Sequence, residues 1–474
     1  MMSFSDFPPP AELPNNMHHS EVLLYLCLYT QAFKLRQHIQ FKTTVVSVRQ
    51  RPDFTATGQW EVETERRENQ RDTHVFDAVI VCTGHFTQPH LPLRDFPGTR
   101  NHNIQNAEGL QGKRVVVIGI GNSGGDIAVD ISRVAERVYL STRSGAWVVH
   151  RVGKRGFPRD LNGRSRMHMI MLKLFPSWIN RILEKKLNEE FDHRLYGLKP
   201  KHGFFAQIPV VNDDLPARII SGRVQVKPNV MEFRGSSVVF VDGSGIDKVD
   251  VVVFATGYNY SFPFLPSALQ IKCGYRLCLY KHVFPPALTQ PTLAVVGFIH
   301  ALGSINPLAE MQARWVTRVF KGLTTLPSDK SMLEEIEKDS ATMFACSDRN
   351  PLQVDYIPYM DSLAKLVGVR PNIPWLFLKD TRLVLQVFMG PCTPYQYRLT
   401  GPGCWAGARQ AILTQWERVI QPFRTRVVPE PESRPSSRLS TIVIFLGSSL
   451  LWCFCYKNYP SFFFSPPSFF RFPQ

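Results

Sequence analysis

Short runs of β-branched and aromatic residues, of the length of β-strands, alternate along this chain with polar turns and a few longer amphipathic segments. The first such segment, residues 20–35, predicts a helix with Ser20 as its N-cap. Residues 145–223 lack this alternation and predict an insertion with a helix at residues 177–191, and another helix is predicted at residues 308–323. The predicted strands cover residues 39–48, 60–65, 76–84, 137–143, 223–230, 237–244, 250–258 and 291–298.

A glycine-rich turn interrupts the most apolar part of this pattern. Gly119-Ile120-Gly121-Asn122-Ser123-Gly124 follows the run VVVI and precedes DIAVDI, so it matches G-x-G-x-x-G between a buried strand and a helix. We expect Gly119 to allow a tight turn, Gly121 to let the backbone approach a pyrophosphate, and Gly124 to let helix and strand pack closely. The helix N-terminus would face the anion. A turn of the same composition without a ligand is the alternative.

The end of the following strand indicates which nucleotide would bind. NAD sites carry an acidic residue about 20 residues after the glycines, whereas Leu140-Ser141-Thr142-Arg143 contains no carboxylate. A guanidinium at Arg143 suits a 2′-phosphate, which favours NADP(H) over NAD. The alternative is a solvated surface charge.

Two other strands end in small residues, at V-C-T-G (81–84) and F-A-T-G-Y (254–258). Such turns carry the chain past a bound dinucleotide without side-chain obstruction. With the glycine turn between them, they predict an α/β fold of the Rossmann-like type with two dinucleotide-binding domains, as in flavoproteins that bind FAD and NAD(P).

The charge of the chain raises the question of acidic partners. Its 474 residues include 55 Lys and Arg against 39 Asp and Glu, a formal net charge of +16. This excess suits phosphorylated cofactors and anionic membranes, and the absence of a recognisable basic helix or aromatic platform argues against nucleic acid as a partner. The nine cysteines form no C-x-x-C pair. We interpret Cys273 and Cys278 as two unrelated thiols in an edge strand, although their C-x4-C spacing is that of a redox dithiol in some flavin reductases.

The C-terminal region carries a membrane signal. Residues 439–456 contain no charged side chain and span about 27 Å as a helix, just enough to cross a thin bilayer. They follow a Pro-, Ser- and Arg-rich linker, whose arginines favour a cytosolic position for the preceding body. An interfacial anchor and a buried C-terminal helix are the alternatives. The N-terminus has no signal-peptide pattern.

These motifs together resemble the flavin-containing monooxygenases of the microsomal membrane. The resemblance covers residues 3–456, and within the family it is closest to form 5, which is associated with Baeyer–Villiger oxidation. The segments that carry it include FSDFP (4–8), FDAVIVCTGH (76–85), GKRVVVIGIGNSGGDIAV (112–129), NDDLPARIISG (212–222), FATGYNYSFPFL (254–265) and GPCTPYQYRLTGPG (390–403).

The resemblance implies the chemistry of this family. NADPH would reduce FAD, the reduced flavin would add O2 to form a C4a-hydroperoxide, and one oxygen atom would pass to a soft nitrogen or sulfur nucleophile, typically a xenobiotic, or to a ketone. It places the chain on the endoplasmic reticulum membrane, in contact with lipid and with its body facing the cytosol. No metal site is implied, and the catalytic residues stay unknown.

The resemblance also implies which residues contact the cofactors. Arg143 fits the 2′-phosphate of NADP, and Gln312 is a candidate flavin contact, with packing on the core as its alternative. The residues implied to contact NADP around the glycine turn are Gly119, Gly121, Asn122, Ser123, Gly124, Gly125 and Asp126.

The chain also departs from the family pattern. No G-x-G-x-x-G precedes Val115, where the family carries its FAD-binding unit, and a family fingerprint expected between Gly98 and Gly112 is missing, with His102 an unconvincing substitute. Cys404 stands where the family has a basic residue. We therefore expect an N-terminally truncated relative that binds FAD poorly or not at all, which leaves a membrane-anchored NADP-binding remnant as the alternative function.

Seven segments are expected on this basis. They are a remnant of the FAD-binding domain (1–108), the NADPH-binding domain (109–144 and 224–259), a helical insertion (145–223), the return to the FAD domain with the C-terminal region (260–425), a linker (426–438), the membrane anchor (439–456) and a Phe-rich tail (457–474).

Overall fold

The computed structural model describes residues 2–66, 70–98, 109–161, 164–266, 269, 272–273, 276–301, 303–340 and 352–426. The chain divides into two compact units, Met1–Pro422 and Phe423–Gln474, and the helices α1 to α13 all belong to the first. The predicted anchor and tail, nearly all of the linker, and His102 lie outside the described residues. None of the helices within the described ranges is long and apolar enough to cross a membrane.

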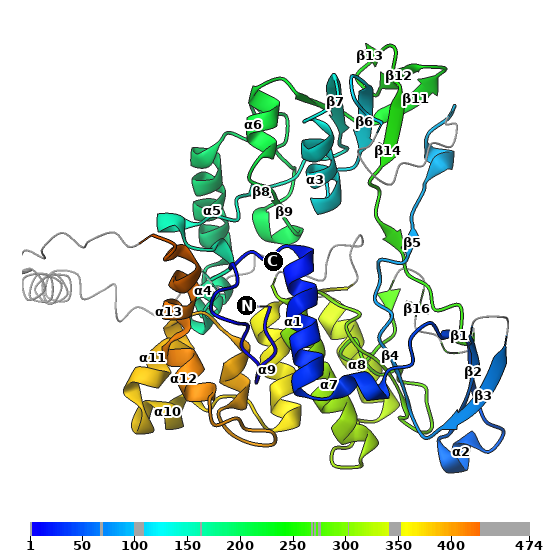
Figure 1. Cartoon of the computed structure of the whole chain (residues 1–474), viewed down its shortest axis with the longest axis vertical. Helices are drawn as coiled ribbons and strands as arrows, with labels where there is room; N and C mark the ends of the chain where they lie inside the picture. The colour runs from blue at the N-terminus through cyan, green and yellow to red at the C-terminus, as the bar shows by residue number, and fades with distance from the viewer. Residues whose placement is uncertain are drawn as a thin grey trace, which may run out of the picture. The chain divides into compact units, whose positions relative to one another are not determined.

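A four-stranded parallel sheet in the order β10-β7-β6-β14 positions the glycine turn (Figure 1). Its central strand β6 consists almost entirely of β-branched residues, which suit a strand buried on both faces. The bounds of the strands are β6 Arg114–Ile118, β7 Arg137–Ser141, β10 Val224–Lys227 and β14 Val251–Phe254.

Different elements cover the two faces of this sheet. Val115 and Val117 of β6 pack in one core with α3 (Asn122–Ile131) and α6 (Leu215–Ile220). Val116 and Ile118 point to the opposite face, where they pack with an antiparallel meander. The meander strands are β11 Val230–Arg234, β12 Ser237–Phe240 and β13 Gly245–Ile246. Both faces are therefore buried, as the continuous apolar run predicted.

The insertion between β7 and β10 carries its own small elements. Two helices follow each other, and a short parallel pair of strands brings the two ends of the insertion together. The predicted helix at 177–191 is confirmed with a shift of one residue. The bounds are β8 Val148–Val149, α4 Arg166–Leu174, α5 Pro176–Glu190 and β9 Val210–Val211.

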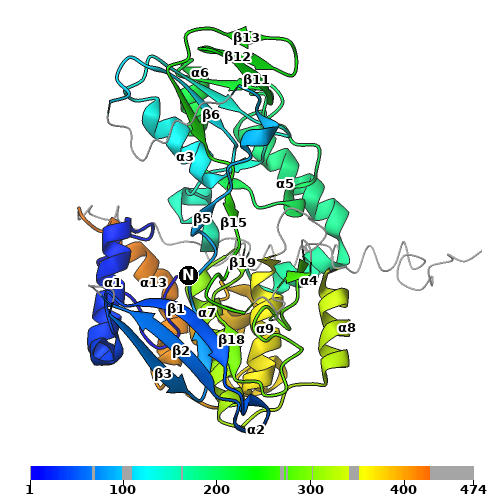
Figure 2. The ribbon, with the colours of Figure 1, turned by 90° about the vertical axis from the view of Figure 1, so that its right-hand side faces the viewer.

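The remaining part of the first unit combines an antiparallel sheet with helices. The strands of the β1-β2-β3 sheet lie side by side (Figure 2). A parallel pair, β4 with β18, packs in the same core as this sheet. The helices α7 and α9 supply half of the buried residues of a second core. The bounds are α1 His19–Ala32, β1 Thr44–Gln50, α2 Phe54–Thr57, β2 Trp60–Glu65, β3 Arg71–Phe76, β4 Val79–Val81, β5 Gln88–Pro89, β15 Tyr258–Asn259, β16 Lys272–Cys273, β17 Arg276–Leu277, β18 Leu293–Val295, β19 His300–Ala301, α7 Ile305–Phe320, α8 Asp329–Ser340, β20 Gln353–Val354, α9 Tyr356–Val367, α10 Ile373–Lys379, α11 Thr381–Met389, α12 Ala408–Leu413 and α13 Gln415–Ile420.

Several local predictions need correction. Ser20 is not the N-cap of α1, because the helix begins at His19 and the N-cap is His18, two residues earlier. The backbone N–H of His18 donates to Glu21 Oε2 at 2.7 Å, so the acidic residue in the first turn sets the start of the helix. Three strands predicted as single are divided. In residues 76–84, β3 ends at Phe76 and β4 begins at Val79. Residues 223–230 are divided between β10 and β11, and residues 250–258 between β14 and β15.

Candidate functional site

The glycine turn joins β6 to α3 with little space to spare. Gly119 has φ = +108°, and a Cβ there would lie 2.4 Å from the carbonyl oxygen of Ala255. A Cβ on Gly124 would lie 2.0 Å from the carbonyl oxygen of Gly119. Any larger side chain would push the helix away from the strand. The packing roles predicted for Gly119 and Gly124 are therefore confirmed.

The start of α3 is open, in contrast to this tight packing. Gly121 is the N-cap residue of α3, and a Cβ on it would meet no atom of the described residues within 4 Å. Ser123, in the first turn, is exposed. The helix is ten residues long and has no acidic residue in its first turn. Unpaired N–H groups and the helix dipole therefore favour an anion at this open end.

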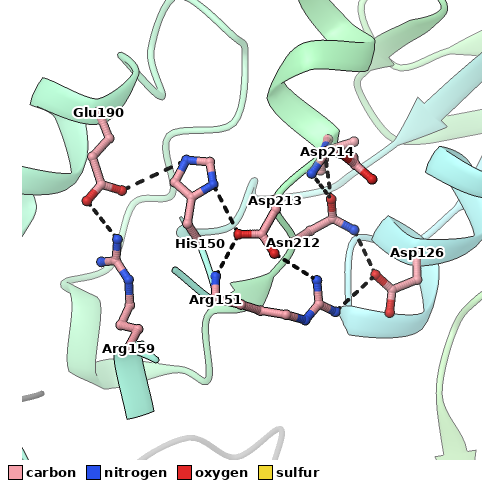
Figure 3. A network of polar contacts seen from close by, with 9 residues as sticks. Asp126, His150, Arg151, Arg159, Glu190, Asn212, Asp213 and Asp214 are labelled. Carbon is pink, nitrogen blue, oxygen red and sulfur yellow. Dashed lines mark hydrogen bonds and ion pairs between the residues drawn. The ribbon is translucent and has the colours of Figure 1, made fainter. Parts of the chain in front are cut away.

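Three of the predicted site residues contact the insertion, and Figure 3 shows one of them, Asp126, with its partner Asn212. Asn122 Oδ1 accepts a hydrogen bond from the backbone N–H of Val211 at 2.8 Å, and Asp126 Oδ1 accepts one from Asn212 Nδ2 at 2.7 Å. A Cβ on Gly125 would lie 3.1 Å from Val210 Cγ1. The first turn of α3 thus rests on β9 and the residue that follows it.

Arg143 lies at the same edge of the sheet as the glycine turn. Ile118 and Ser141 are register partners at the carboxyl ends of the neighbouring strands β6 and β7. Arg143 follows two residues later and is exposed. Its side chain is therefore available to a group bound beside the start of α3, at the edge where ligands of parallel α/β sheets bind.

The two other glycine-containing turns meet each other. Gln88–Pro89, which follows the V-C-T-G turn, pairs antiparallel with Tyr258–Asn259, which ends the F-A-T-G-Y turn. His90 N donates to the Gly257 carbonyl at 2.8 Å, and Thr256 Oγ1 donates to the His90 carbonyl at 2.5 Å. These segments lie more than 160 residues apart in the sequence, so only the fold reveals their pairing.

Comparison with known proteins identifies the family. A family model described as flavin-binding monooxygenase-like matches residues 1–456. The chain belongs to this family. It is 50% identical over 463 residues to flavin-containing monooxygenase 5 of Rattus norvegicus, with 95% of this chain and 86% of that protein covered. It is 47% identical over 469 residues to the N-oxide-forming dimethylaniline monooxygenase 4 of Homo sapiens, with coverages of 96% and 84%.

Solved structures agree on the fold of this monooxygenase. S-allyl-L-cysteine S-oxygenase from Allium sativum is 25% identical with a TM-score of 0.55, covering 87% of this chain and 81% of its own. Cyclohexanone monooxygenase from Rhodococcus sp. Phi1, solved with NADP⁺, shares the fold at 17% identity and a TM-score of 0.53, covering 74% of this chain and 83% of its own. The α/β fold with two dinucleotide-binding domains is thereby confirmed. The chain is an NADPH-dependent flavin monooxygenase that uses FAD and oxygenates soft nucleophiles.

Gln312, predicted to contact the flavin, lies inside this monooxygenase with 0% of its surface exposed. Its Oε1 accepts from Gly297 N at 2.8 Å and its Nε2 donates to Tyr359 Oη at 2.7 Å. Tyr359 Oη in turn donates to the Lys281 carbonyl at 2.6 Å. Both ends of the amide therefore tie α7 to α9 and to the chain after β18, and the flavin contact stays a prediction.

His85 is a candidate that the sequence analysis missed. It directly follows the V-C-T-G turn, is 8% exposed, and neither ring nitrogen has a hydrogen-bond partner among the described residues. Burial, with a smaller contribution from His300, lowers the pKa of His85 to about 4, so the ring is neutral at pH 7. Phe298 packs edge-on against it at 5.9 Å. Its position at the carboxyl end of a parallel strand was the available sequence signal.

Cys278 corrects the interpretation of the C-x4-C pair. It is disulfide-bonded, so it is not a free thiol. It follows the hairpin of β16 and β17, in which Cys273 and Arg276 are register partners. The prediction of two unrelated thiols in an edge strand is wrong for Cys278.

Proposed function

We propose that NADPH binds at the start of α3 and that residues 109–144 and 224–259 form its domain. The carrying observation is the open N-terminus at Gly121, at the sheet edge that also presents Arg143. The helix end would receive the pyrophosphate, and the guanidinium would pair with the 2′-phosphate. The proposed contacts are Gly119, Gly121, Asn122, Ser123, Gly124, Gly125, Asp126 and Arg143.

FAD would bind to the part of the chain built by residues 1–108 and 260–425. Two buried polar atoms in this part of the chain have no hydrogen-bond partner in the described structure: Ser304 Oγ at the N-cap of α7 and Tyr356 Oη in the first residue of α9. Unpaired buried polar groups are costly, so both fit the polar edge of a bound cofactor. Bound FAD would supply the activation of O2. For Gln312 we favour the packing role over a flavin contact, because both ends of its amide are already bonded.

The side chains around His85 would contribute by excluding water. The ring of Phe86 is tilted by 48° against the ring of His85, with the ring centroids 4.0 Å apart. The rings of Tyr260, Phe298 and His300 lie about 6 Å from it. A neutral, largely aromatic wall lowers the local dielectric and favours neutral or soft substrates over charged ones. We propose uncharged nitrogen and sulfur nucleophiles, typical of xenobiotics, and ketones as substrates, the latter because of the likeness to flavin-containing monooxygenase 5.

Membrane association has a second basis besides the predicted anchor at residues 439–456. Apolar side chains on α4, α5, α10 and α11 are exposed, and α4 packs against both α5 and α11. We call these side chains the apolar surface: Ile170, Met171, Leu174, Phe175, Trp178, Trp375, Phe377, Leu378, Leu385 and Met389. Lys173, Arg181, Lys379 and Arg382 lie on the same helices. Apolar side chains beside cations suit an anionic membrane, and we propose the cytosolic face of the endoplasmic reticulum.

The full chain, purified in detergent, tests this function. We expect flavin absorbance with FAD released on denaturation, and NADPH oxidation that rises when a thioether or a cyclic ketone is added. Oxidation with the thioether but not the ketone would restrict the substrates to soft nucleophiles. A chain that binds NADP⁺ but retains no FAD would instead support the alternative function, an NADP-binding membrane protein without oxygenase activity.

A further inference from the structure

Asn212 contacts two helices at once. It follows β9 in the insertion and is 3% exposed. Its Nδ2 donates to Asp126 Oδ1 on α3 at 2.7 Å. Its Oδ1 accepts from the backbone N–H groups of Asp214 at 3.0 Å and Leu215 at 2.7 Å, which open α6. The recorded hydrogen bonds of this side-chain amide therefore go to the start of α6 and to the first turns of α3.

The neighbouring contacts act on the same turn of α3. Arg151 donates to Asp213 Oδ2 at 3.2 Å, and its guanidinium lies 3.8 Å from Asp126 Oδ1. Beyond Asp213, the contacts continue through His150 to Glu190 at the end of α5 (Figure 3). Exposed ion pairs of this kind contribute little individually. The buried amide of Asn212 is the contact with the largest expected effect, because loss of its N–H would leave a carboxylate facing an acceptor.

We infer that Asn212 is a positioning residue of the NADP(H) site. By holding Asp126 it fixes the orientation of the first turns of α3, and with them the N–H groups proposed to receive the pyrophosphate. Its hydrogen bond also partly offsets the negative charge of the Asp126 carboxylate, which would otherwise repel a bound anion more strongly. This inference rests on the proposed function, because it takes the start of α3 as the NADP(H) site.

The substitution Asn212→Asp separates the two roles of this side chain. The new carboxylate keeps both acceptors for α6 and loses the donor to Asp126. Titration calorimetry of the full chain with NADP⁺ should show about tenfold weaker binding. Asn188→Asp is the matched control, since Asn188 Nδ2 donates to the Glu184 carbonyl within the insertion at 2.9 Å. The control should lower the thermal midpoint and leave the NADP⁺ affinity at the parent value.

A reversed pair provides the rescue. In Asp126→Asn with Asn212→Asp, the amide and the carboxylate exchange places and the hydrogen bond can form again. We expect the loss caused by Asn212→Asp to shrink to less than threefold in the Asp126→Asn background, as contacting residues couple energetically. If flavin-loaded enzyme is available, Asn212→Asp should raise KM for NADPH and leave kcat nearly unchanged.

Other outcomes would overturn the inference in distinguishable ways. If the unaltered chain does not bind NADP⁺, the proposed site itself is wrong, and the inference falls with it. If the unaltered chain binds and Asn212→Asp binds equally well, only the inference is wrong. The inference is also wrong if Asn188→Asp weakens binding as much as Asn212→Asp, or if the loss is the same in both backgrounds at position 126.

Discussion

At the scale of single residues, one exposed side chain, Arg143, and one buried side chain, His85, carry the chemistry that we expect of the two proposed cofactor regions. Arg143 is exposed beside the glycine turn, and the stretch Leu140-Ser141-Thr142-Arg143 has no carboxylate that could bind the ribose of NAD. His85 is buried next to other aromatic rings and finds no hydrogen-bond partner in the part of the chain that the structure describes. Arg143 is a solvent-exposed cation, and His85 is a base that burial keeps neutral.

We expect Arg143 to determine the nucleotide preference of the proposed site. Arg143→Ala should weaken NADP⁺ binding by about 10- to 100-fold, because a charge-assisted hydrogen bond contributes roughly 1.5–3 kcal/mol, and should leave NAD⁺ binding nearly unchanged. Calorimetric titration with each nucleotide measures both. Arg133→Ala removes the same charge just after the far end of α3 and should affect neither. Equal losses for both nucleotides would contradict the assignment.

His85 predicts an acid-sensitive stability. Its pKa is about 4 in the fold and about 6.5 when unfolded, so the unfolded chain binds the proton more tightly. The neutral ring therefore stabilises the fold above pH 6.5, and this stability is lost as the pH falls toward 4. His85→Phe should reduce the loss between pH 7 and 4 by on the order of 2 kcal/mol, measured by urea unfolding. Burial also lowers the pKa of His282 to about 4, so the contribution of His282 to the pH dependence of stability should remain in this variant. An unchanged pH dependence would rule His85 out as a source.

At the scale of elements, the unit of β6, the glycine turn and α3 divides its glycines between two tasks. Gly124 lets the helix approach the strand, and Gly121 leaves the helix end open. We therefore expect stability and the proposed NADP(H) binding to depend on different residues of one turn. The same unit is held from the insertion side through Asn122 and Asp126.

Alanine substitutions at the two glycines test this division. Gly124→Ala places a Cβ 2.0 Å from a carbonyl oxygen and should cost about 2–4 kcal/mol of unfolding free energy. Gly121→Ala meets open space at φ = −81°, so the cost should stay below about 1 kcal/mol while NADP⁺ binding weakens. Urea unfolding and calorimetry on the two variants form a matched pair. Strong destabilisation by Gly121→Ala, or unaltered binding, would refute the assignment.

At the scale of the whole molecule, the net charge of +16 and the apolar surface suit the same partner. Leu378 is 86% exposed and Trp178 is 64% exposed, so covering them would remove apolar area from water. A membrane would cover both. This association would act in addition to the predicted anchor, which lies outside the described residues.

The apolar surface predicts weaker membrane binding after charge insertion. The double variant Trp178→Glu with Leu378→Glu should float with anionic phosphatidylserine vesicles severalfold less than the parent chain. Ile220→Glu is the control, because Ile220 is 77% exposed on α6, apart from the apolar surface. Equal flotation of all three proteins would remove the apolar surface from the membrane proposal and leave the anchor as its basis.

The sequence by itself determined the features that depend on neighbours along the chain. The strand at Val115–Ile118, the glycine turn and the helix after it follow from local periodicity and from the sterics of glycine, and the helix of the insertion follows in the same way. Family membership also follows from motifs readable in one dimension. The N-cap of α1 was misplaced by two residues, because the carboxylate of Glu21 outweighed the cap expected from Ser20.

Only the tertiary structure decided the contacts between distant segments. Asn212 donates a hydrogen bond to Asp126, 86 residues away in the sequence. Both ends of the Gln312 amide are hydrogen-bonded, one to the backbone N–H of Gly297 and the other to Tyr359 on α9. The sequence around Asn212 and around Gln312 gives no sign that these side chains are buried rather than solvated. The burial of His85 has the same origin, since residues near position 300 enclose it. Local sequence encodes periodicity and turn sterics, whereas burial and pairing emerge only when remote segments pack together.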